Sequence, residues 1–109
     1  MPRTPRKRPN ELTTGWPSVG SSTPAGEAAR LFAIGLRDAL GAQSVRALGR
    51  KSGVAPGTIR GIIEGRTWPD LETIAKLETT LSAPLFPTSV PDGIRYRARS
   101  GSGAWSEPG

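Results

Sequence analysis

Apolar side chains recur at helical spacing through the middle of the chain. Phe32 and Leu36 lie one turn apart, which predicts an amphipathic helix over residues 24–40. Thr23 is a suitable N-cap residue, and Pro24 suits the first helical position because its fixed φ matches a helix. We therefore expect the first helix to begin at Pro24.

Two short helices are predicted next, over residues 45–52 and 56–64. Ser44 is the expected N-cap of the first, because its hydroxyl can accept a hydrogen bond from a first-turn amide. The apolar side of the second should hold Ile59, Ile62 and Ile63, and its outward side Gly57, Arg60, Gly61 and Glu64. The two segments therefore resemble a helical hairpin with one apolar face.

A fourth helix is predicted behind Asp70. Its apolar stripe is expected to consist of Leu71, Ile74, Leu77 and Leu81. Pro84 and Pro87 stop further helix, and Leu85 and Phe86 are expected to fold back as a hydrophobic lid. The pattern thus predicts a small all-α domain of four helices, with room for one extra turn, over residues 24–87.

The flanking segments contain few large apolar residues and much Pro, Gly, Ser and Thr. We expect residues 1–23 to form a disordered basic arm, and residues 88–109 a flexible tail rich in Arg, Gly and Ser. Between residues 94 and 99 of the tail, apolar residues alternate with arginines, but a strand without a partner is not stable.

Glycines occupy the positions where two short helices make the strictest demands. Gly41, Gly53 and Gly65 each follow a predicted helix, where a left-handed residue can close the last turn. In the unit over residues 45–64, the fifth residue must be small because it faces the next helix, and it is Gly49. The core positions of the unit hold Leu48, Val54, Ile59 and Ile62.

The stretch from Leu48 to Ile59, followed by Glu64-Gly65-Arg66, Pro69 and a leucine-rich helix, resembles the Cro/cI-type (XRE) helix-turn-helix family. The resemblance covers roughly residues 24–87, and its specific part is 44–81. It implies a λ-repressor-like fold whose third helix lies in the major groove of DNA while the second crosses the phosphate backbone. Many members are transcriptional regulators, often repressors.

The resemblance places the DNA contacts on the second helix, the outward face of the third, and the residues around them. The candidates are Ser44, Arg46, Arg50, Ala55, Pro56, Gly57, Thr58, Arg60, Gly61, Glu64 and Arg66. The family's base-reading positions hold a proline and two glycines here, which offer no hydrogen-bonding side chain. Base readout is therefore expected to be poor, or to come from Thr58, Arg60 and Glu64.

A formal net charge of +6 and a pI of about 11.1 favour a polyanionic partner. The N-terminal arm carries Arg3, Arg6, Lys7 and Arg8. The arm is either a solubilising tail or a segment that enters a minor groove. Trp68 likewise has two interpretations, as a core plug or as a stacking residue that faces a partner.

Several function classes have no support in the sequence. The chain has no cysteine and no histidine, which removes disulfides, thiolate chemistry, the commonest general base and the commonest metal ligand. It has no phosphate-binding loop and no apolar run that could span a membrane. We therefore expect no enzyme activity, no catalytic residue, no cofactor and no metal.

The basic N-terminus lacks the apolar stretch of a secretory signal, so a cytoplasmic protein, associated with the nucleoid when bound to DNA, is expected. The expected partner is double-stranded DNA, with a homodimer on DNA left open. The main alternative is a protein-interaction module, such as an antitoxin or adaptor that reuses the fold. A non-specific or RNA-binding role is third, since stacking platforms for single strands are missing.

Overall fold

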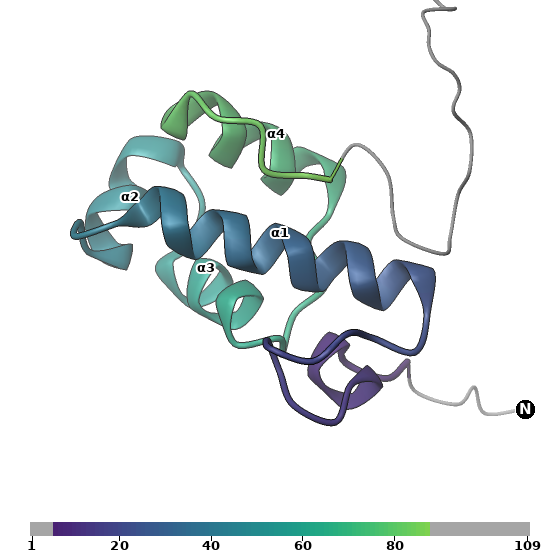
Figure 1. The fold of residues 1–109 in the computed structure, drawn as a ribbon. Helices are drawn as coiled ribbons and strands as arrows, with labels where there is room; N and C mark the ends of the chain where they lie inside the picture. The colour runs from purple at the N-terminus through teal and green to yellow at the C-terminus, as the bar shows by residue number, and fades with distance from the viewer. Residues whose placement is uncertain (1–5, 88–109) are drawn as a thin grey trace, which may run out of the picture.

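The computed structural model describes residues 6–87 as a short 3-10 helix followed by four α-helices (Figure 1). The elements are η1 (Pro9–Leu12), α1 (Pro24–Leu40), α2 (Val45–Ser52), α3 (Pro56–Ile63) and α4 (Leu71–Leu81). Within the described residues there is no strand, which confirms the all-α fold class. In Figure 1, α1 crosses the molecule with α4 above it and α3 and η1 below it.

The helices begin where the sequence predicts, because capping groups stop them from extending further. Thr23, Ser44 and Asp70 each accept a hydrogen bond from a backbone amide of the following turn, at 2.9, 3.0 and 2.8 Å. These bonds satisfy amides that have no partner inside the helix. The N-cap of α3 is Ala55, which makes no such bond, and this helix begins instead with Pro56.

The three turn glycines all have positive φ, and Gly53 has the predicted left-handed conformation, whereas the ψ of −129° at Gly41 lies outside it. Gly41, Gly53 and Gly65 have φ values of 58°, 80° and 77°. At Gly49, an added Cβ would lie 2.9 Å from the Val54 carbonyl oxygen and 3.0 Å from Cγ of Pro56. The C-terminal half of α2 therefore approaches the start of α3 so closely that only glycine fits.

The core is one cluster that lies where the four α-helices meet. Its fully buried side chains are Phe32, Leu36, Leu48, Ile59, Ile62 and Leu77. Leu85 folds back onto this cluster, as predicted, and its amide donates a hydrogen bond to Oε2 of Glu78 at 2.7 Å. Phe86 does not join the lid and is 45% exposed, because in this non-helical segment its side chain points away from that of the adjacent, buried Leu85.

Leu71 also differs from its prediction. Its side chain is 83% exposed, whereas Ile74 and Leu77 of the same helix are buried. The helical rotation of about 100° per residue places Leu71 about 60° from Ile74 and about 120° from Leu77, at the margin of the stripe. α4 is therefore held to the core by its middle and last turns.

The structure corrects the expectation of a disordered arm for residues 6–23. Pro9 is buried, and the indole of Trp16 donates a hydrogen bond to the Ile63 carbonyl at the end of α3. The low apolar content of this segment predicted disorder, but a few aromatic, proline and backbone contacts hold it in place. Arg3 and the tail over 88–109, with its alternating residues, lie outside the described residues.

A nearly buried ion pair fastens the second half of this segment to α1. Glu27 is 9% exposed and accepts hydrogen bonds from Nε of Arg30 at 2.9 Å and from the Ser21 amide at 2.8 Å. Arg30 also donates to the Pro17 carbonyl at 2.9 Å. The hydrogen bond from Arg30 is the largest influence that holds the pKa of Glu27 below its ordinary value. The loop before α1 therefore has a defined position.

Candidate nucleic-acid interface

The outward side of α2 presents two arginines. Arg46 and Arg50 are exposed and lie one turn apart. Ser44 at the start of the helix is exposed as well, and its hydroxyl already accepts the amide of Ala47. The cap role of Ser44 is thus confirmed, while its contact with a phosphate stays a prediction.

The first turn of α3 is open on its outward side. Ala55 and Gly57 are exposed, and Pro56 and Thr58 are half-buried. A Cβ added at Gly57 would have no heavy atom within 4 Å. The fold therefore does not require glycine at this position, and an approaching partner meets the helix backbone directly.

Gly61 does not belong to this outward face, so its predicted place there is wrong. The residue is buried, and an added Cβ would lie 2.5 Å from Oγ1 of Thr67. The chain after α3 folds back over this side, and the amides of Arg66 and Thr67 donate to the Gly61 carbonyl at 2.8 and 3.2 Å. Gly61 therefore serves packing and is not part of the outward face of α3.

The charged side chains near the end of α3 are not equivalent. Glu64 forms an ion pair with Arg66, with 2.7 Å between Oε1 and the guanidinium Nη2. Arg60 is exposed, and among the described residues it forms no ion pair. The carboxylate of Glu64 is thus already engaged, which leaves Arg60 as the charged group of α3 that is open to a partner.

Trp68 is not part of the core cluster, so its interpretation as a core plug is wrong, while stacking on a partner stays a prediction. It is half-buried, and its indole donates a hydrogen bond to the Lys7 carbonyl at 2.8 Å. The guanidinium carbon of Arg6 lies 3.9 Å from the centre of its ring. Trp68 therefore anchors the N-terminal segment, a role that the isolated tryptophan did not reveal.

Asn10 and Trp16 are two further residues at this end of α3 that the sequence analysis did not single out. Their side chains donate to the Glu64 and Ile63 carbonyls, at 3.1 and 2.9 Å. The available signal was Trp16 itself, a large aromatic residue in a segment otherwise poor in them.

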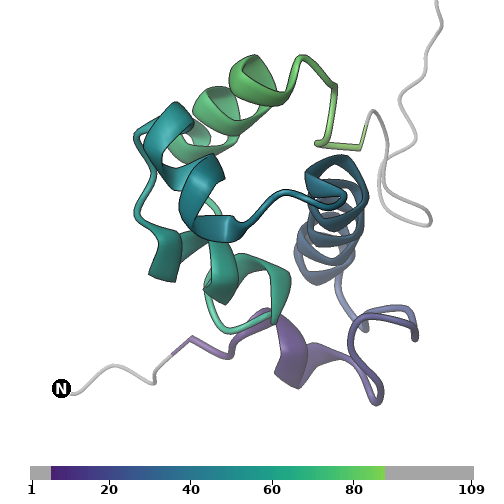
Figure 2. The same cartoon turned by 90° about the vertical axis from the view of Figure 1, so that its left-hand side faces the viewer.

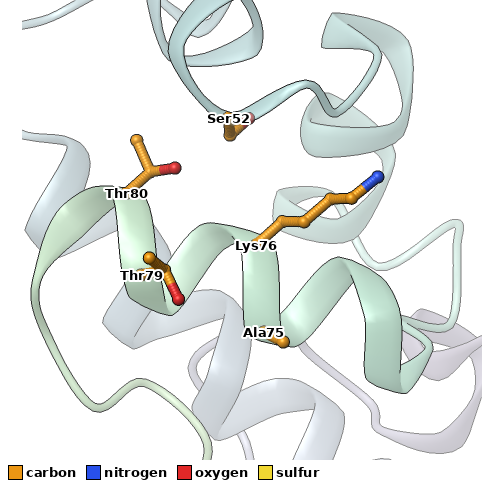
Figure 3. A pocket seen from close by; sticks show the side chains of 5 residues that line it. All are labelled: Ser52, Ala75, Lys76, Thr79 and Thr80. Atoms are coloured by element: carbon orange, nitrogen blue, oxygen red, sulfur yellow. The ribbon is translucent and has the colours of Figure 1, made fainter.

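A shallow depression lies between α2 and α4, away from these residues (Figure 3). Its lining consists of Ser52, Ala75, Lys76, Thr79 and Thr80. Nζ of Lys76 is paired with Glu72 at 3.1 Å. Within residues 6–87 no group of three potential metal ligands comes together, and no helix has the length and apolarity needed to cross a bilayer.

Comparison with known proteins shows a family similarity in the central part of the chain. A helix-turn-helix family model matches residues 36–85, from the last turns of α1 to Leu85. No curated protein and no solved structure matches the chain. Domains of this family generally bind DNA. Over residues 36–85 the chain is thus similar to the helix-turn-helix family, in agreement with its resemblance to the Cro/cI (XRE) type.

Proposed function

We propose that the chain binds double-stranded DNA through α2 and α3 and acts as a transcriptional regulator of the repressor type. The observation that carries the proposal is the outward face of α3, which combines the open backbone at Gly57 with the exposed Arg60. The major groove of B-DNA is wide enough to admit an α-helix. A face without bulk at its start allows that helix to approach the groove closely.

The charges beside α3 favour a phosphate backbone as the partner. Arg46 and Arg50 add two exposed positive charges on α2 to that of Arg60 on α3. Phosphate contacts fix how a protein sits on a duplex, whereas contacts with base edges select the sequence. Because Ala55, Pro56 and Gly57 carry no hydrogen-bonding side chain, we expect DNA shape, or two copies bound at a fixed spacing, to provide much of the specificity.

The test compares duplex DNA, single-stranded DNA and RNA of equal length by fluorescence anisotropy, followed by selection of bound sequences from a random duplex pool. We expect the chain to prefer duplex and the pool to converge. A protein-interaction module that reuses the fold would show no duplex preference. A repressor role further requires that the selected site lies where a bound domain blocks access of other proteins to a promoter.

A large side chain at position 57 should weaken DNA binding without lowering the stability of the fold. Gly57→Leu is expected to raise the free energy of unfolding by up to about 1 kcal/mol, because leucine suits a helix better than glycine and meets no neighbour here. The same change is expected to weaken duplex binding about tenfold, a loss of about 1.4 kcal/mol, because it blocks the approach to the groove. Thermal unfolding and anisotropy titration measure the two effects.

Ala75→Leu is the matched control for this change, since Ala75 is an exposed helical residue of α4. We expect this control to leave duplex affinity unchanged. Equal losses of affinity in the two variants would contradict the placement of Gly57 at the DNA.

Arg60→Ala should weaken binding to all duplexes alike, because Arg60 lies at the side of α3 and is expected to bind a phosphate. Loss of one phosphate contact reduces the slope of log K against log salt by about 1. Arg37→Ala removes an equal charge from an exposed position on α1 and is the control. The measurement is relative affinity across single-base changes in a selected site. A loss confined to one base pair would instead show that Arg60 reads that base.

A further inference from the structure

The carbonyl groups at the C-terminal end of α3 are satisfied by a segment from the beginning of the chain. A helix leaves its last carbonyls without partners inside the helix. Here the Ile63 carbonyl accepts from the indole of Trp16 at 2.9 Å, and the Glu64 carbonyl accepts from the side-chain amide of Asn10 at 3.1 Å. The backbone amide of Asn10 donates to the Gly65 carbonyl at 2.9 Å. Residues 6–16, called the docked segment below, thus cap the helix that faces the DNA.

The contact is tight as well as polar. Gly65 has a φ of 77°, and an added Cβ would lie 2.7 Å from Cε2 of Trp16 and 2.8 Å from Cβ of Asn10. Pro9 is buried beside them in η1. The docked segment therefore packs directly on the backbone of the turn that follows α3.

This packing gives defined positions to three exposed cations. The Lys7 carbonyl accepts from the Trp68 indole at 2.8 Å, and the Arg8 amide donates to Oε1 of Glu11 at 2.7 Å. The Arg6 guanidinium stacks on the Trp68 ring at 3.9 Å. Stacking uses the face of a guanidinium and leaves its N–H donors, which lie in the plane, for a phosphate. The backbone of Lys7 and the side chain of Arg6 thus contact Trp68 in the turn between α3 and α4, while Arg8 is held within the docked segment.

The attachment lies on the side of the molecule where α3 is. Figure 2 shows the docked segment passing directly below α3. The beginning of the docked segment, α2 and the start of α3 all lie toward the left of this view. A duplex that accepts α3 in its major groove runs past both ends of that helix. Its phosphates are then within reach of cations at the C-terminal end of α3.

We infer that the docked segment is a second DNA-binding element, in which Arg6, Lys7 and Arg8 bind backbone phosphates of the duplex that α3 occupies. The inference rests on the proposed function. A disordered basic tail loses conformational freedom when it binds, which reduces its contribution to affinity. The docked segment is already ordered by Asn10, Trp16 and Trp68, so its charges contribute with little of that loss.

The first experiment compares charge removal at two places. Arg6→Gln with Lys7→Gln is expected to reduce the salt slope of duplex binding by about 2. The matched control, Arg37→Gln with Lys76→Gln, removes two charges from α1 and α4 and is expected to leave the slope unchanged. If the two double variants reduce the slope equally, overall charge rather than position is responsible and the inference fails.

The second experiment releases the docked segment and keeps every cation. Asn10→Ala with Trp68→Leu removes the side-chain hydrogen bonds to the Glu64 and Lys7 carbonyls and the stacking partner of Arg6. We expect a five- to tenfold loss of duplex affinity, which is about 1 to 1.4 kcal/mol. Affinity equal to that of the unaltered chain would overturn the inference. Absence of duplex binding by the unaltered chain would instead overturn the proposed function.

A third readout does not depend on weakened binding. Because the chain has no cysteine, Lys7→Cys provides a single attachment site for a DNA-cleaving iron chelate. A docked segment should produce cleavage over a few neighbouring base pairs at one edge of the selected site. Cleavage spread along the whole duplex would show that residue 7 has no fixed position at the DNA and would overturn the inference.

Discussion

Raising the salt concentration from about 50 to about 200 mM is expected to weaken duplex binding by roughly 500-fold. This follows if about five phosphates are contacted, since each releases condensed counterions and the slope of log K against log salt is then about −4.5. The exposed cations available for these contacts are Arg46, Arg50 and Arg60 on α2 and α3, and Arg6, Lys7 and Arg8 in the docked segment. Anisotropy titrations at four or more salt concentrations measure the slope.

A flat salt response would contradict DNA binding altogether. A slope of about −2.7, which corresponds to three phosphates, would restrict the contacts to α2 and α3 and exclude the docked segment. Deleting residues 1–9 is expected to lower the slope without changing the preferred site. That deletion also removes Pro9 and the Lys7 carbonyl, which hold the docked segment, so the charge variants at Arg6 and Lys7 are the cleaner comparison.

Substitution of two glycines that share a left-handed backbone should have unequal effects on stability. Gly53 and Gly65 have φ values of 80° and 77°. An added Cβ meets no atom within 4 Å at Gly53, whereas at Gly65 it would lie 2.7 Å from the Trp16 ring. Gly53→Asn is expected to cost less than about 1 kcal/mol, because asparagine tolerates this backbone region. Gly65→Asn is expected to cost about 2 to 4 kcal/mol, because it adds overpacking to the same backbone cost.

In a domain of this size, about 1 kcal/mol corresponds to a change in Tm of roughly 4 to 8 °C. Thermal unfolding followed by circular dichroism should therefore place Gly65→Asn at least about 4 °C below Gly53→Asn. Gly53→Val is a further check, since a β-branched residue at positive φ should cost about 1 to 3 kcal/mol. Equal Tm values for the two asparagine variants would contradict the close packing of the docked segment on Gly65.

Local sequence signals determined the helices and the turn between α2 and α3. A hydroxyl or carboxylate before a helix acts within one turn of the chain, so Thr23, Ser44 and Asp70 could be identified as caps without knowledge of the fold. The same is true of Gly53, whose backbone conformation closes α2. Gly49, within α2, could be predicted because α2 and α3 are only three residues apart, which limits how they pack.

Local signals predicted only part of the surface that we propose to face DNA. Helical periodicity placed Gly57, Arg60 and Glu64 on the outward side of α3, and the structure has all three exposed. Periodicity also placed Gly61 there, but Thr67 covers it, and Arg66 pairs with Glu64. These differences arise because the turn after α3 folds back on the helix, and no repeat along the chain encodes that turn.

The place of residues 6–23 was decided by the tertiary structure alone. Trp16 donates to the Ile63 carbonyl, 47 positions further along the chain, and Asn10 to the Glu64 carbonyl, 54 positions further. Neither Trp16 nor Asn10 lies in a periodic apolar pattern. Such contacts depend on how α1 and the end of α3 are already arranged, which single-segment propensities do not contain. Helix positions and turn glycines could therefore be read from local chemistry. The position of Arg6 and Lys7 beside the turn after α3 depends instead on contacts between distant segments.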